Sequence, residues 1–210
     1  MEDSPDDKAQ SNFTAPALHI MRTNNKGWDY CGNAQASVDG TCQIILACDV
    51  TEAAHDKQQA EPMAQATLAT LSQAGRERPK DASGAVQALP ASLDNGYYSE
   101  AAVLTLETLG FDPYIATGRQ RHPGAQAAAL EAPATVQERM AVKIRTPAGK
   151  ALYASRTVIV EPVFGQIKEA RGFRRFLLRG LATIRGEGRL VCLTHNLLKI
   201  WRYGRVRSAI

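Results

Sequence analysis

The pattern of hydrophobic and polar residues predicts regular elements from about residue 30 onward. Two short β-favouring runs, 30–37 and 43–50, flank Val38-Asp39-Gly40-Thr41, and Asp-Gly between two such runs indicates a hairpin. Residues 56–74 then carry apolar side chains at helical spacing. The first part of the folded region is therefore predicted to be two antiparallel strands followed by a helix.

A second group of elements follows a polar stretch that contains proline and glycine. Residues 85–93 are predicted to form an apolar strand, and a helix capped by Ser99 runs to Gly110. A short strand is predicted over 113–116, and residues 137–203 are largely helical in pattern. This order predicts an α/β fold, with a mixed sheet flanked by helices and a helical pair at the C-terminal end.

Composition divides the chain into one domain and two poorly patterned ends. Residues 1–29 have no apolar period and are expected to form a loosely ordered lead-in. The domain is expected to span 30–203, with a loop insertion at about 117–136 that is rich in Gly, Pro, Gln and Ala. Residues 204–210 are interpreted as a tail.

The overall composition is that of an ordinary globular domain. The chain has 210 residues, of which 44% are hydrophobic and 22% charged. It holds no apolar run long enough to span a membrane, and its acidic first residues do not fit a signal peptide, so an intracellular location is expected. The four cysteines show no C-x-x-C pairing and are interpreted as buried free thiols.

The net charge of +4 conceals two halves of opposite sign. Residues 1–138 hold 9 Lys and Arg against 18 Asp and Glu, whereas residues 139–210 hold 16 against 3. A basic segment of this density suits a polyanion. It also suits a solvated helix face that offsets the acidic half, and charge alone does not separate the two interpretations.

Asp94 is the first candidate for a chemical role. It stands at the predicted C-terminal end of the strand 85–93, the edge at which α/β sheets place their ligands, and Asn95-Gly96 allows a sharp turn beside it. That position suits a metal ligand. Taken alone, the local sequence favours an ordinary turn aspartate over a metal ligand.

Glu161 is the second candidate, a lone acid between an apolar run and Val163-Phe164. Pro162 places it at or just before the start of a helix, or at a kink in a longer one. A partly buried carboxylate needs a cation, and Arg156 or Lys168 could supply one without any catalytic purpose. Asp94 and Glu161 together are compatible with two Mg²⁺ ions that activate the attacking oxygen and stabilise the leaving oxygen in phosphodiester chemistry.

Downstream of Glu161, basic residues recur every three or four positions, which predicts an amphipathic helix with an arginine-rich side suited to DNA phosphates. These residues are Lys168, Arg171, Arg174, Arg175 and Arg179. In the last helix, Leu181, Ile184, Val191, Leu193, Leu197, Leu198 and Trp201 are interpreted as core. His195 and Asn196 are interpreted as satisfied polar residues of a packed helix, with a catalytic role as the alternative.

Several sequence blocks resemble those of bacterial DDE-type insertion-sequence transposases, in the order and rough spacing of that family over about residues 8–203. The blocks are NAQASVDGTCQIILACDVT, AAHDKQQAEPM, LDNGYYSEAAV, YIATGRQRH, VEPVFGQIKEARGFRRFLLRGL and VCLTHNLLKIWR. The resemblance implies a ribonuclease H-like catalytic core. It also implies that Asp94 and Glu161 are metal-binding carboxylates for Mg²⁺ or Mn²⁺, with two ions in the complete enzyme.

The chain also departs from the family pattern. The resemblance implies a first catalytic Asp on an early strand, and no matching strand is recognisable here, so the core is expected to lack its first strand and the chain to be a truncated copy. Ala15 and Ala17 stand where the family commonly has acidic residues. Asp49 is the nearest alternative acid and is not expected to replace the missing one.

Three hypotheses follow from the resemblance. The chain is a transposase that cleaves and joins DNA with metal ions, here inactive or weakly active. Alternatively, it is a non-catalytic DNA-binding remnant that interferes with a full-length transposase, or a fragment that does not fold stably because a sheet edge is unpaired. The implied partners are transposon-end DNA and a second copy or a full-length transposase, without a membrane, in the bacterial cytoplasm and on the nucleoid when bound.

Overall fold

The computed structural model describes residues 19–22, 28–118 and 135–207. Strand β1 (His19–Arg22) pairs antiparallel with β2 (Trp28–Cys31). Residues 19–22 and 28–29 of the expected lead-in therefore belong to paired strands, whose backbone N–H and C=O groups are satisfied without an apolar period. Residues 1–18, including Ala15 and Ala17, lie outside the described residues.

The predicted hairpin is present, with a longer turn than expected. Strand β3 (Asn33–Val38) pairs antiparallel with β4 (Ile45–Thr51). The amide of Asp39 donates to the carbonyl of Ile44 at 2.9 Å, and the Asp39 carboxylate accepts from the amide of Cys42 at 2.9 Å. The turn therefore spans six residues and passes through Gln43, which has a φ of 58°.

The second pair of strands forms a parallel unit with a helix as its crossover. Strand β5 (Leu89–Leu93) pairs with β6 (Phe111–Ile115), and α2 (Glu100–Thr108) connects them. The Ser99 hydroxyl caps α2, as predicted, by accepting from the amide of Ala102 at 3.0 Å. The strand predicted from residue 85 begins only at Leu89, because an isolated bridge joins Lys80 to Val86 and turns that stretch back on itself.

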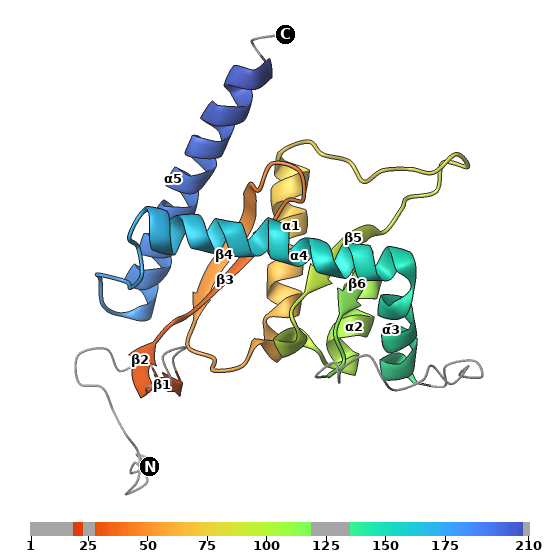
Figure 1. Ribbon diagram of the computed structural model, residues 1–210, viewed down its shortest axis with the longest axis horizontal. Coiled ribbons are helices and arrows are strands. Elements are labelled where there is room, and N and C mark those ends of the chain that lie inside the picture. Colours follow the sequence, from red (N-terminus) through yellow and green to blue (C-terminus); the bar gives the residue numbers. More distant parts are fainter. Residues whose placement is uncertain (1–18, 23–27, 119–134, 208–210) are drawn as a thin grey trace, which may run out of the picture.

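The predicted α/β class is confirmed, whereas the expected single mixed sheet is not formed by the described residues. Antiparallel β3–β4 and parallel β5–β6 remain separate two-stranded sheets, and β1–β2 is a third. Helix α1 (Ala60–Gln73), preceded by a short 3₁₀ turn η1 (Asp56–Gln58), contacts β4, β3 and α2. Helix α4 (Pro147–Gly165) runs across both pairs of strands and contacts β3, β5 and β6 (Figure 1).

Two hydrophobic clusters form the core. The larger one lies where α1, α2 and α3 (Val136–Arg145) meet β6, and the smaller one joins β4 to the end of α4. All four cysteines are half-buried rather than buried. The buried members of the larger cluster are Ala60, Ala64, Ala102, Val103, Leu106, Phe111, Ile115, Met140 and Ile144, and those of the smaller are Ile45, Val163 and Ile167.

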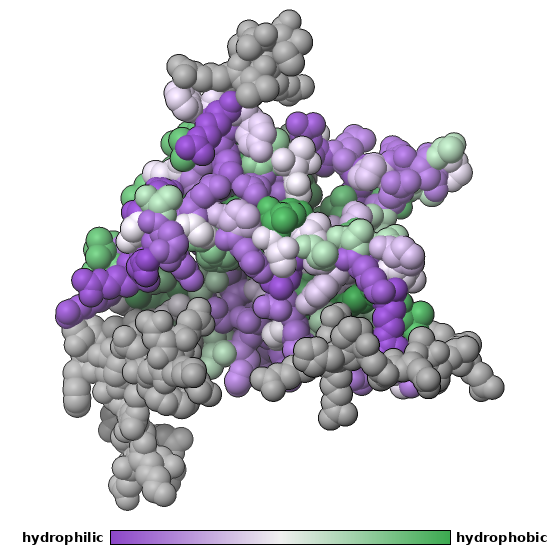
Figure 2. Space-filling view, in the orientation of Figure 1, coloured by the Kyte–Doolittle hydropathy of each residue, from purple (hydrophilic) through white to green (hydrophobic). Residues whose placement is uncertain are grey.

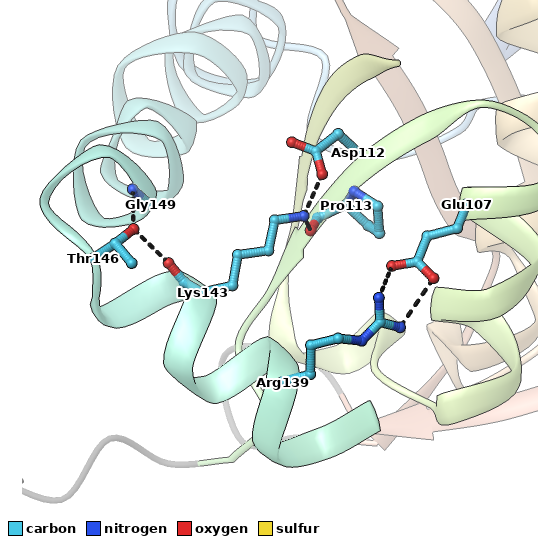
Figure 3. Close-up of polar contacts among 7 residues, drawn as sticks. All are labelled: Glu107, Asp112, Pro113, Arg139, Lys143, Thr146 and Gly149. Atoms are coloured by element: carbon cyan, nitrogen blue, oxygen red, sulfur yellow. Dashed lines mark hydrogen bonds and ion pairs between the residues drawn. The ribbon is translucent and has the colours of Figure 1, made fainter. Parts of the chain in front are cut away.

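Helix α3 is fixed against β6 and α2 by charged contacts (Figure 3). Arg139 donates twice to Glu107, at 2.8 and 3.0 Å, and Lys143 pairs with Asp112. The helix begins with a capping box between Thr135 and Glu138. The loop expected at about 117–136 lies mostly outside the described residues, since 119–134 are not described.

The last helix, α5 (Leu181–Arg207), is continuous and leaves the body of the molecule at its C-terminal end (Figure 1). It passes through Gly188, where an added Cβ would meet the Val50 side chain at 3.1 Å, so this glycine allows a close approach of α5 to β4. The tail expected over 204–210 is helical as far as Arg207.

The face of α5 that docks on the hairpin is polar. The Asn196 side chain both accepts from the Ile45 amide and donates to the Ile45 carbonyl, at 2.8 Å each, and a ring nitrogen of the buried His195 lies 3.0 Å from the Gln43 carbonyl. The interpretation of His195 and Asn196 as satisfied packing residues is confirmed. Burial lowers the pKa of His195, which favours the neutral ring.

The leucines of α5 do not form the core that the sequence predicted. Leu193, Leu197 and Trp201 are 54%, 56% and 55% exposed, and only Ile184 of the predicted set is buried. The opposite face, with His195, is turned inward because it satisfies the backbone of the hairpin. In the part of the chain that the structure describes, no helix is long and apolar enough to cross a membrane.

Candidate functional site

Asp94 directly follows strand β5, where the sequence placed it. It caps the short 3₁₀ turn η2 (Asn95–Tyr97), and its Oδ1 accepts from the amide of Asn95 at 2.7 Å. One carboxylate oxygen of Asp94 therefore already accepts a hydrogen bond from the backbone of the turn. The side chain is 60% exposed, so its other oxygen is accessible from solvent.

Glu161 lies in the last turns of α4, so of the two positions that the sequence allowed, a helix start or a site within a longer helix, the structure shows the second. Pro162 stands inside the helix and cannot donate to the carbonyl of Val158 four residues earlier. The Gln43 side chain supplies that missing donor at 2.9 Å, which explains how the helix continues through the proline. The side chain of Glu161 is 57% exposed.

The structure brings Asp94 and Glu161 together around one cation. The Nη1 atom of Arg156 lies 3.9 Å from Oδ2 of Asp94 and 3.7 Å from Oε1 of Glu161. Arg156 was named from the sequence only as a neutraliser of Glu161, and its link to Asp94 was missed because no local pattern connects residues 62 positions apart. Each carboxylate is a hard oxygen donor of the kind that Mg²⁺ prefers.

A second polar cluster holds the turn that carries Asp94. Asp56 Oδ1 accepts from the side-chain amides of Asn33 at 2.7 Å and Gln35 at 2.8 Å, and the Tyr97 hydroxyl donates to Gln35. Burial, followed by the charges of Asp56 and Asp94, raises the pKa of Tyr97, so the hydroxyl keeps the proton that it donates. These contacts join β3 and η1 to η2.

Gly96 allows a close approach at this junction. A Cβ on Gly96 would lie 2.8 Å from Oδ2 of Asp56, so the Asp56 carboxylate would have to shift and its bonds to Asn33 and Gln35 would be disturbed. The Asn95-Gly96 pair, which the sequence interpreted as a turn signal, thus also permits the close approach that positions Asp94.

Asp49 does not join the two carboxylates. Its Oδ1 pairs with the Nε atom of Arg185 at 3.1 Å, on the side of β4 that α5 covers. Among the described residues, no group of three or more His, Cys, Asp or Glu side chains is arranged to hold a metal ion. The donor set shown is therefore a pair, Asp94 and Glu161.

The predicted arginine-rich helix is wrong as an element. Helix α4 passes into a π-helical turn, η3 (Gln166–Ala170), and ends where Gly172 adopts a φ of 69°. Residues 171–180 then form an irregular loop, because Gly172 and Gly180, at a φ of 80°, adopt left-handed conformations that interrupt a helix. The surface of this loop is mixed, with hydrophilic side chains beside hydrophobic ones (Figure 2), among them the exposed Leu177 and Leu178.

The five basic residues named from the sequence are all exposed. Two of them form contacts within the protein: Arg171 donates to the Val191 carbonyl at 3.3 Å, and Arg174 pairs with Glu169. Lys168 stacks over the Phe164 ring at 5.4 Å. Arg175 and Arg179 have no polar side-chain contact with the rest of the described chain. The cations open to a ligand are therefore Lys168, Arg175 and Arg179.

Residues 119–201 match the family model described as transposase DDE domain. The matched segment includes Arg156, Glu161 and the basic loop, whereas Asp94 precedes it. No curated protein and no solved structure matches the chain. The match agrees with the resemblance for the sequence blocks that lie within residues 119–201.

Proposed function

We propose that this chain, whose residues 119–201 match the transposase DDE domain family, binds a divalent metal ion and transposon-end DNA at neighbouring sites. The observation that carries the proposal is the convergence of Asp94 and Glu161 on a single nitrogen of Arg156. One carboxylate lies inside the matched segment and the other outside it. Their proximity therefore supports a shared role independently of the family match.

The two side chains fit one Mg²⁺ or Mn²⁺ ion better than two. Mg²⁺ is commonly bound by one or two carboxylates, with water and substrate phosphate completing its coordination. Both side chains are more than half exposed, which leaves room for those waters. A bound ion would supply charge neutralisation and an activated oxygen at a phosphodiester. The described residues add no third carboxylate, so DNA cleavage is expected to be weak or absent.

The arrangement of strands supports a ribonuclease H-like core that lacks one strand. The antiparallel pair β3–β4, the helix α1 and the parallel pair β5–β6 follow the predicted order, yet the two pairs do not join. Helix α4 crosses both of them and carries Glu161 toward the turn after β5. A missing strand between the two pairs would account for their separation.

The metal site can be tested by Mn²⁺ binding to the purified chain. Asp94→Asn and Glu161→Gln are each expected to weaken Mn²⁺ binding about tenfold or more, because each removes a charged oxygen ligand. Glu52→Gln, at an exposed acid outside the pair, is the matched control and should bind as the parent does. Calorimetric titration measures all four proteins. Equal affinity for Asp94→Asn and the parent would contradict the proposal.

Binding of DNA is expected to depend on the three open cations. The triple change Lys168→Ala, Arg175→Ala and Arg179→Ala should weaken DNA binding and flatten its salt dependence, with the slope falling by about one for each phosphate that is no longer neutralised. A matched triple change removes the same charge from exposed lysines elsewhere, at Lys57, Lys80 and Lys150. Fluorescence anisotropy over a series of salt concentrations distinguishes the two sets. Equal slopes would exclude the basic loop as the DNA-binding surface.

A non-catalytic role is the second candidate, favoured by the exposed cations and by a pair of carboxylates to which the described residues add no third. In that case the chain binds DNA and interferes with a complete transposase without turnover of its own. DNA binding that persists in Asp94→Asn, together with no metal-dependent cleavage by the parent chain, would support it. Cleavage that Asp94→Asn abolishes would exclude it.

A further inference from the structure

The cation between Asp94 and Glu161 is part of the protein itself. The Arg156 side chain is 22% exposed, much less than the carboxylates at 60% and 57%. It lies over the Tyr153 ring, with the guanidinium carbon 5.8 Å from the ring centroid, and its Nε is buried without a hydrogen-bond partner among the described residues. The guanidinium is thus positioned by packing within α4 and approaches the carboxylates from the protein side.

The contacts with the carboxylates are loose. At 3.9 and 3.7 Å, both exceed the 2.7–3.2 Å of a normal N–H···O hydrogen bond. Neither carboxylate forms a bidentate pair with Arg156, the geometry in which arginine binds such groups most strongly. The attraction is therefore mainly electrostatic, and another cation can replace it without breaking a hydrogen bond.

We propose that Arg156 is an internal counterion that holds Asp94 and Glu161 together in the metal-free protein and competes with a divalent ion for them. The inference rests on the proposed metal site. Both carboxylates lie within 4 Å of the same Arg156 nitrogen, so without a cation there they would repel each other. A divalent ion that binds both oxygens would in turn be repelled by the guanidinium, so metal binding requires Arg156 to turn away. Arg156 thereby sets the metal concentration at which the site fills.

The test compares Mn²⁺ affinity in Arg156→Gln, in the parent and in Arg145→Gln, which removes an exposed arginine from α3. Arg156→Gln is expected to bind Mn²⁺ at least about fivefold more tightly, the lower end of typical coupling between two sites. Arg145→Gln should match the parent. Equal or weaker binding by Arg156→Gln, alongside weaker binding by Asp94→Asn, would overturn the competition and leave the metal site intact. If Asp94→Asn and Glu161→Gln have no effect in either background, the proposed metal site itself fails.

A second measurement uses the parent protein and does not depend on how a variant folds. Phenylglyoxal modifies accessible guanidinium groups, and mass spectrometry reports the rate at Arg156. Mn²⁺ is expected to accelerate modification of Arg156 in the parent and to leave it unchanged in Asp94→Asn. A rate that Mn²⁺ leaves unchanged or slows in the parent would show that the guanidinium is not displaced, and the inference would fall.

Discussion

Replacing Gly149 by alanine is expected to lower the free energy of unfolding by about 3 kcal/mol, near the upper end of typical overpacking costs. An added Cβ would lie 2.0 Å from the backbone carbonyl oxygen of Lys143 and 2.9 Å from the hydroxyl of Thr146. Neither atom is free to move, because that hydroxyl donates to the Lys143 carbonyl at 2.7 Å and accepts from the Gly149 amide at 3.0 Å (Figure 3). The junction between α3 and α4 would have to open.

Gly165→Ala is the matched control on the same helix. Its added Cβ would meet nothing within 4 Å, so the change should be neutral or stabilise by about 0.5–1 kcal/mol through helix propensity. Chemical denaturation followed by circular dichroism compares the two variants. If both behave alike, the α3–α4 junction is not as tightly packed as described. Because α4 carries both Arg156 and Glu161, Gly149→Ala should also disturb metal binding.

Leu106→Ala is expected to destabilise the protein by about 2–5 kcal/mol, the usual cost of truncating a buried leucine. Leu106 is 2% exposed and belongs to the core between the helices and β6, so the change removes packed atoms and leaves a cavity. The same core supports α2, whose N-terminus follows the turn that holds Asp94. The loss of stability should therefore be accompanied by weaker Mn²⁺ binding at temperatures where the variant begins to unfold.

Leu104→Ala, two residues away on α2, separates burial from helix propensity. Leu104 is 49% exposed, so the same substitution in the same helix should cost well under about 1 kcal/mol. Thermal and urea unfolding of both variants give the difference directly. A similar loss of stability in the two would show that α2 presents a different face to the core.

Several elements could be predicted because their signals are local. The Ser99 cap, the left-handed Gly110 at a φ of 85° and the turn after Asp94 lie within a few residues of what they determine. The prediction of a helix over residues 171–180 was wrong because it also rested on a local pattern. Basic residues at helical spacing suggested a helix, but Gly172 and Gly180 interrupt it, and the spacing of charges does not report backbone conformation.

The orientation of α5 was beyond sequence reasoning. Its leucines recur at a spacing typical of a buried face, yet Leu193 and Leu197 are more than half exposed. The face of α5 that turns inward is the one that can form hydrogen bonds to the hairpin. Its His195 and Asn196 side chains pair with backbone groups of Gln43 and Ile45. A requirement that arises about 150 residues away leaves no trace in the local period.

The residue pattern by itself predicted the α/β class and the position of Asp94 after a strand, and the sequence blocks indicated the similarity of residues 119–201 to the transposase DDE domain. These features depend on residues that are close together in the sequence. Packing in three dimensions was needed to bring Asp94 and Glu161 together at Arg156 and to leave the strands in separate pairs. Coulomb attraction acts through space, so its partners are set by how α4 packs across both pairs of strands and not by their separation in sequence.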